Sequence, residues 1–92
     1  YKRRFLKKIF SDEEISYLKE DVFKMCLSFS FKESIWKALP EKMQKKLIFN
    51  KIKIGWKNGK PFLLEEIGNY NYLLSYSITN KYVITLSLLF KL

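Results

Sequence analysis

The stretch YNYLLSYSITNKYVITLSLLF, residues 70–90, decides the fold. Apolar and polar residues alternate in Tyr70–Ile78 and again in Tyr82–Phe90, which is the period of a β-strand with one buried face. A three-residue loop, Thr79–Lys81, places the apolar sets of both strands on one side. We therefore expect an antiparallel hairpin with this odd loop and an opposite, hydroxylated side formed by Ser75, Ser77, Thr85 and Ser87.

A second hairpin is predicted just upstream. Lysines alternate there with three apolar residues, Ile52, Ile54 and Trp56. The pair Asn58-Gly59 follows, and it is typical of a type I′ turn because both central positions need a positive φ. Pro61–Ile67 fits either the return strand, with its proline at an edge, or a short helix.

The N-terminal half predicts helices. Ser11 and Glu14 have the spacing of a capping box at the start of a helix over residues 11–27. Its apolar stripe has helical spacing and consists of Ile15, Leu18, Val22, Cys26 and Phe29. On this pattern Cys26 is a small buried hydrophobic residue.

Two further helical segments are expected. A second capping box, Ser30 with Glu33, opens a helix to about Leu39. Pro40 then either begins a separate helix over residues 41–50 or kinks one longer helix. Its core-facing residues are expected to be Leu39, Met43, Leu47 and Ile48.

These elements predict an α+β fold, in which two or three N-terminal helices pack on a three- to four-stranded antiparallel β-sheet. Ninety-two residues fit a single domain, 1–92, and residues 1–10 are expected to form a basic N-terminal arm. The apolar content of 48% is enough for a core without metals or disulfides.

Most enzyme machinery has no counterpart in this sequence. Histidine is absent, and the one cysteine has no partner for a disulfide or a zinc site. No apolar run is long enough to span a membrane as a helix. We expect no metal, no cofactor, no membrane contact and a cytoplasmic location. Catalytic residues are not identified.

The basic charge is concentrated in parts of the chain. The net charge is +9, residues 41–60 carry +6, and residues 61–92 sum to zero. Such segregation indicates a surface that attracts phosphates, and a neighbouring aromatic ring can stack on bases. The candidate nucleic-acid-binding residues are Lys45, Lys46, Lys51, Lys53, Lys57, Lys60 and Trp56. The alternative is a solvated lysine face with Trp56 in the core.

Helices followed by an antiparallel meander, with the step Gly68-Asn69-Tyr70-Asn71-Tyr72, resemble the RelE/ParE-type toxins over residues 39–90. This resemblance implies a metal-independent RNase or RNA-binding domain whose partners are RNA or the ribosome. The alternative partner for the basic surface is an acidic protein, either antitoxin-like or a subunit of a complex. The second hypothesis is a non-catalytic protein-interaction module. It would act as an inhibitor or accessory subunit and dock through the sheet edge or the basic face.

Overall fold

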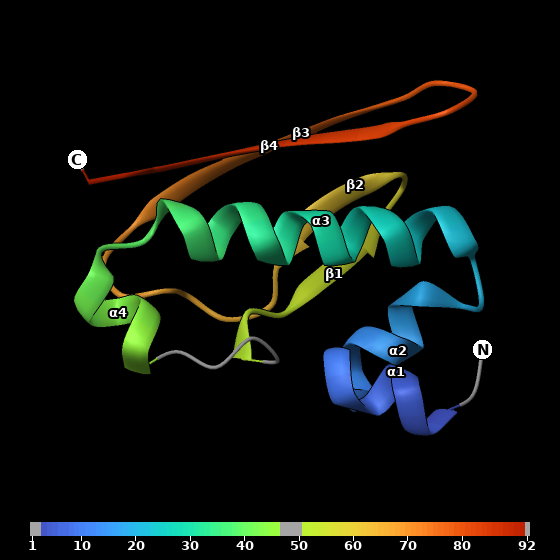
Figure 1. Ribbon diagram of the computed structural model, residues 1–92, viewed down its shortest axis with the longest axis horizontal. Coiled ribbons are helices and arrows are strands. Elements are labelled where there is room, and N and C mark those ends of the chain that lie inside the picture. Colours follow the sequence, from blue (N-terminus) through green and yellow to red (C-terminus); the bar gives the residue numbers. More distant parts are fainter. Residues whose placement is uncertain (1–2, 47–50, 92) are drawn as a thin grey trace.

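A computed structural model describes residues 3–46 and 51–91 of the chain. Four helices precede four strands: α1 (Arg3–Ile9), α2 (Asp12–Leu18), α3 (Val22–Ala38), α4 (Glu41–Lys46), β1 (Ile54–Lys57), β2 (Lys60–Leu63), β3 (Asn71–Ile78) and β4 (Val83–Phe90). The strands pair as two antiparallel hairpins, β1–β2 and β3–β4. The predicted α+β class is confirmed. Figure 1 shows α3 as the long central helix, with the β3–β4 hairpin running along it.

The first capping box is confirmed. The Glu14 amide donates to Ser11 Oγ at 3.3 Å, and the Ser11 amide donates to Glu14 Oε1 at 3.0 Å. The helix that it opens ends sooner than predicted, because Lys19 and Glu20 adopt the left-handed conformation, with φ of 49° and 62°. Asp21 then caps α3 by accepting from the Lys24 amide at 3.2 Å.

This break gives α3 a new phase. Ser30 therefore lies within α3 and does not cap a helix, so the second predicted capping box is wrong. The predicted stripe fails beyond Leu18 for the same reason, and Cys26, expected to be buried, is exposed. The buried residues of α3 are instead Met25, Leu27, Ser28, Phe31, Lys32 and Ile35.

A separate helix after Pro40 is confirmed over the described residues Glu41–Lys46, which form α4. Three hydrogen bonds join α4 to the end of α3. Trp36 Nε1 donates to the Gln44 carbonyl at 3.2 Å, and Gln44 Nε2 donates to the carbonyls of Trp36 at 3.0 Å and Lys37 at 3.3 Å. The predicted continuation through residues 47–50, with Leu47 and Ile48, lies outside the described part of the chain.

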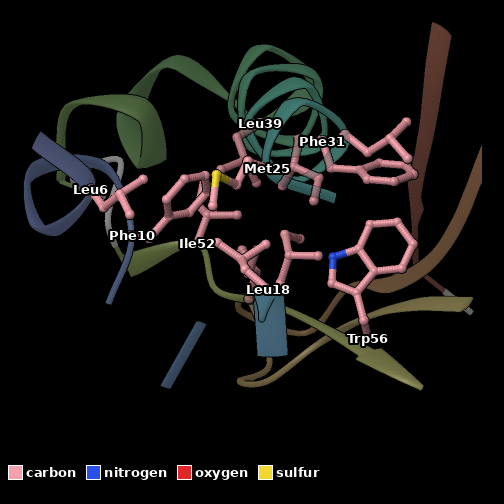
Figure 2. Packing of buried hydrophobic residues seen from close by; sticks show 12 residues of the cluster. Leu6, Phe10, Leu18, Met25, Phe31, Leu39, Ile52 and Trp56 are labelled. Atoms are coloured by element: carbon pink, nitrogen blue, oxygen red, sulfur yellow. The ribbon is translucent and has the colours of Figure 1, made fainter. Parts of the chain in front are cut away.

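The β1–β2 hairpin has the predicted two-residue turn. Asn58 and Gly59 both have a positive φ, and Lys57 lies opposite Lys60. Residues 60–63 form the return strand, so the strand alternative for this segment is correct. The hairpin contributes Ile54 and Trp56 to the core that α3 covers, as Figure 2 shows for the Trp56 ring near Phe31.

The β3–β4 hairpin forms as predicted, but its predicted register is wrong. Ile78 lies opposite Val83, so the loop has four residues, 79–82, and β4 is turned over relative to the prediction. Its hydroxyls face α3, where Thr85 bonds Ser30 at 2.6 Å and Ser87 bonds Ser34 at 2.5 Å. The alternation of apolar residues in β4 does not reveal that these hydroxyls form hydrogen bonds with serines of α3.

The two hairpins are linked by tyrosine side chains. The Leu63 amide donates to Tyr72 Oη at 3.1 Å, and Tyr76 Oη donates to the Gly59 carbonyl at 2.6 Å.

In the described ranges, no helix is long and apolar enough to cross a membrane.

Candidate functional site

The predicted lysines lie on different elements. Lys45 is on α4, whereas Lys57 and Lys60 flank the β1–β2 turn. Figure 1 shows α4 near one end of α3 and the β1–β2 turn toward the other end. Lys51 is exposed just before β1. Lys46 is the last residue of α4 that the structure describes, and its side chain lies outside the described part of the chain. The role of this set as a contact surface stays a prediction.

Lys53 is held by carboxylates. Its ammonium lies 3.0 Å from Glu65 Oε1 and 3.6 Å from Glu13 Oε1. The hydrogen bond to Glu65 raises the pKa of Lys53. This lysine is therefore engaged in tying α2 to the segment that follows β2.

Trp56 is buried, with 6% of its surface exposed. Its ring nitrogen donates to Ser28 Oγ at 2.7 Å, and its ring packs edge-on to Tyr76. Trp56 therefore belongs to the core, and its ring is not presented to a base.

A buried ion pair lies at the centre of the molecule. The Lys32 ammonium is 2.7 Å from Glu14 Oε1, and both side chains are fully buried. Lys32 also donates to the Ile52 carbonyl at 2.5 Å and lies over the Phe10 ring at 5.4 Å. Burial lowers the pKa of Lys32, an effect that the Glu14 carboxylate opposes.

Glu14 is equally well satisfied. Besides Lys32, its carboxylate accepts from the Ser11 amide and, through Oε2, from the Ile54 amide at 2.9 Å. The pair therefore joins α2, α3 and the start of β1. It fixes the rotation of α3 about its own axis, because Lys32 cannot leave its partners without stranding a buried charge.

The orientation of α3 that this ion pair fixes also turns Glu33, the residue after Lys32, toward an apolar groove. This groove, hereafter the α3 groove, has a volume of about 440 Å³. It runs between α1, α3 and the start of β4, and it is lined by Leu6, Ile9, Phe10, Met25, Cys26, Phe29, Ser30, Glu33 and Val83. Glu33 is the charged residue among these.

The Glu33 carboxylate combines partial exposure with an apolar surround. Its side chain is 44% exposed, and Oε2 lies 3.8 Å from the Lys37 ammonium one turn further along α3. A carboxylate in this position can accept a proton from a hydroxyl group, and it can also serve as one oxygen ligand of a hard cation. Within residues 3–46 and 51–91, no group of three or more metal-ligating side chains is present.

The sequence analysis did not identify either part of this site, the buried ion pair of Glu14 and Lys32 or the α3 groove with Glu33. A signal was present, since Lys32 occurs in phase with Ser28 and Ile35 on the buried side of α3. A lysine in such a position needs a buried acidic partner. Glu14 was interpreted as a capping residue alone, although its carboxylate both caps α2 and neutralises Lys32.

The family model of the 4'-phosphopantetheinyl transferase superfamily, ACPS, matches residues 1–87 of the chain. No curated protein and no solved structure matched the chain. The match extends from α1 into β4, so it includes every residue of the buried ion pair and of the α3 groove.

This match corrects the functional predictions. The resemblance to RelE/ParE-type toxins is wrong, and so are the RNase or RNA-binding function and the RNA or ribosome partners. A non-catalytic interaction module also does not fit a transferase family. The family acts on carrier proteins. Helix-then-meander order occurs in many α+β folds, whereas the family match rests on nearly the whole chain.

Proposed function

Because the chain belongs to the 4'-phosphopantetheinyl transferase superfamily, we propose that it transfers a 4'-phosphopantetheinyl group to a carrier protein. The match over residues 1–87 is the observation that carries this proposal. We place the transfer at the α3 groove.

The chemistry of the transfer requires a proton acceptor. An acceptor hydroxyl on the carrier protein attacks the phosphorus of the group, a new P–O bond forms, and the P–O bond to the rest of the donor breaks. The departing phosphate keeps that electron pair, and the hydroxyl proton must go to a base. Glu33 suits this role, because its carboxylate borders the groove and is open to solvent.

The donor is a phosphate-rich molecule in which the group is held through a pyrophosphate bond, as in coenzyme A. Lys37 beside Glu33 offers one cation near the groove. The exposed lysines 45, 51, 57 and 60 add a longer-range positive potential that raises the local concentration of such an anion. In this proposal, these lysines attract the phosphate-bearing donor and not a nucleic acid.

The apolar lining of the groove suits the uncharged part of the arm. Leu6, Ile9 and Phe29 offer alkyl and aromatic contacts, and Ser30 places a hydroxyl beside them. Lys32 and Glu14 act as positioning residues, because their ion pair sets which side of α3 faces this lining.

The test combines the purified chain with coenzyme A and an apo-carrier protein, and mass spectrometry follows the gain of one phosphopantetheinyl group. We expect transfer by the native chain and a loss of at least about a hundredfold in Glu33→Gln, the lower range for a general base. Glu41→Gln is the matched control, because Glu41 is an exposed carboxylate on α4 that is paired with Lys45.

Two outcomes would contradict the proposal. If the correctly folded native chain transfers no phosphopantetheinyl group, the proposed function is wrong. If the native and Glu33→Gln chains are equally active, Glu33 is not the base. We also propose that the chain acts as one domain, in the cytoplasm.

A further inference from the structure

Leu6 and Met25 line a second cavity as well as the α3 groove. This cavity, hereafter the α2 pocket, lies between α1, α2 and the start of α3. Its volume of about 530 Å³ is within the range of small-molecule sites. The transfer proposed above makes no use of the α2 pocket. Its lining consists of Leu6, Ile15, Ser16, Leu18, Lys19, Glu20 and Met25.

The inner wall of the α2 pocket is apolar. Three buried side chains and one half-buried side chain form it: Leu6, Leu18, Met25 and Ile15. Ser16 is exposed at the edge, but its hydroxyl already donates to the Glu13 carbonyl at 2.6 Å. An apolar ligand group that covers this wall is stabilised in proportion to the area that it removes from water. Recognition of the polar part of a ligand is left to the charged residues at the mouth.

The mouth of the α2 pocket carries both signs of charge. Lys19 and Glu20 are exposed there, at the break between α2 and α3, and both have a left-handed backbone. The Asp21 amide donates to the Leu18 carbonyl at 2.9 Å and closes this turn. A non-glycine residue is strained in this conformation, and such strain is concentrated at ligand-binding and catalytic sites. The turn therefore holds an ammonium and a carboxylate beside the apolar wall.

These two charges are available to a ligand. Within residues 3–46 and 51–91, neither the Lys19 ammonium nor the Glu20 carboxylate belongs to an ion pair. A ligand with only a negative charge is attracted by Lys19 and repelled by Glu20, and a cation meets the reverse. A ligand with one ammonium and one carboxylate can pair with both residues. An α-amino acid with a large apolar side chain combines this head group with a part that covers the apolar wall.

We propose that the α2 pocket binds a free α-amino acid with a large apolar side chain, for which phenylalanine is the probe. Its carboxylate pairs with Lys19, its ammonium pairs with Glu20, and its ring packs against Leu18 and Met25. The contacts at the mouth are open to water, so each adds little to the affinity. The expected dissociation constant is therefore on the order of 0.1–1 mM. Binding does not require the proposed transfer, so either proposal can fail without the other.

NMR of the methionine methyl groups in the full chain locates the binding. The chain has two methionines, and Met43 lies on α4, near the opposite end of α3 from α1 and α2 (Figure 1). Phenylalanine added up to about 10 mM should shift the Met25 signal along a saturating curve and leave the Met43 signal in place. Alanine should bind at least about tenfold more weakly, because it covers little of the apolar wall.

Two glycine variants test the charges at the mouth. Lys19→Gly and Glu20→Gly each remove one charge, and each is the matched control for the other, because glycine adopts the left-handed conformation without strain. The native chain should bind phenylalanine about threefold more tightly than N-acetylphenylalanine, which lacks the ammonium, or phenylalanine amide, which lacks the carboxylate. Lys19→Gly should lose only the discrimination against the amide, and Glu20→Gly only the discrimination against the N-acetyl compound.

Four results would overturn the proposal. The first is a Met25 signal that does not move up to about 10 mM phenylalanine. The second is equal binding of phenylalanine and its two derivatives by the native chain. The third is that both glycine variants keep the native order of affinities. The fourth is tighter binding of phenylpropionate than of phenylalanine, because the pocket would then select an acid without an ammonium.

Discussion

Lys32 and Glu14 show how a single pair of residues can organise a small domain. Each charge has lost its water, and each is compensated by several protein groups: Lys32 by Glu14 and the Ile52 carbonyl, Glu14 by Lys32 and two backbone amides. Such a pair contributes little net stability compared with well-packed apolar residues, but the loss of one partner leaves the other charge buried.

This asymmetry gives a prediction about stability. Lys32→Met should lower the free energy of unfolding by about 3–5 kcal/mol, because the Glu14 carboxylate then remains buried without its cation. The double change Lys32→Met with Glu14→Leu should cost less than Lys32→Met alone, since no uncompensated charge remains. Urea denaturation of the native chain and the two variants measures both values.

An exposed ion pair provides the control for this prediction. Lys45 and Glu41 lie 3.6 Å apart, and both side chains are more than three-quarters exposed. Lys45→Met should therefore change the free energy of unfolding by less than about 1 kcal/mol. If Lys32→Met proves as mild as Lys45→Met, the central role of the buried pair is refuted.

At the level of elements, the β3–β4 hairpin shows where sequence prediction succeeds and where it stops. Alternation revealed both strands and their pairing, because the period of two residues is a local property. It did not reveal the register, because the choice between two parities depended on serines of α3 more than 50 residues away. Likewise, the Lys19-Glu20 break was missed, since neither residue favours the left-handed conformation as glycine or asparagine does.

The hydroxyl contacts between α3 and β4 can be measured directly. Ser87→Ala should reduce the free energy of unfolding by about 0.5–1.5 kcal/mol, the net value of one hydrogen bond, and Ser34→Ala should reduce it by more, because Ser34 Oγ also donates to the Phe31 carbonyl at 3.0 Å. Because both changes remove the same bond, the double variant should cost clearly less than the sum of the two single changes. Strict additivity would show that Ser34 and Ser87 do not interact in solution.

The whole molecule carries its charge unevenly, and this much was visible in the sequence. The lysine-rich segment and the neutral C-terminal third were correctly recognised as distinct, since they follow from residue counts. The partner class assigned to the basic segment was wrong, because a positive potential attracts any phosphate and does not distinguish RNA from a small anionic donor. The α3 groove was also missed, since α1, α3 and β4 come together only in the folded chain.

The excess positive charge should make stability sensitive to ionic strength. Raising salt from about 0.01 M to about 0.15 M shortens the Debye length from about 30 Å to about 8 Å, so self-repulsion weakens. We expect Tm to rise over this interval at a fixed, dilute protein concentration. Scanning calorimetry or circular dichroism measures the change.

Lys57→Glu is the companion variant for this experiment. It lowers the net charge by two at an exposed position on β1, so the dependence of Tm on salt should become shallower. A Tm that falls as salt is added would mean that favourable ion pairs outweigh the repulsion.

The buried Lys32 also has a consequence for the order of events during folding. Its partners are 18 and 20 residues away in opposite directions along the chain, so two loops must close before the ammonium can give up its water. Neither flanking segment alone can compensate this charge. We therefore expect α3 to dock late and in one concerted step, and substitutions at Lys32 to accelerate unfolding far more than they slow folding.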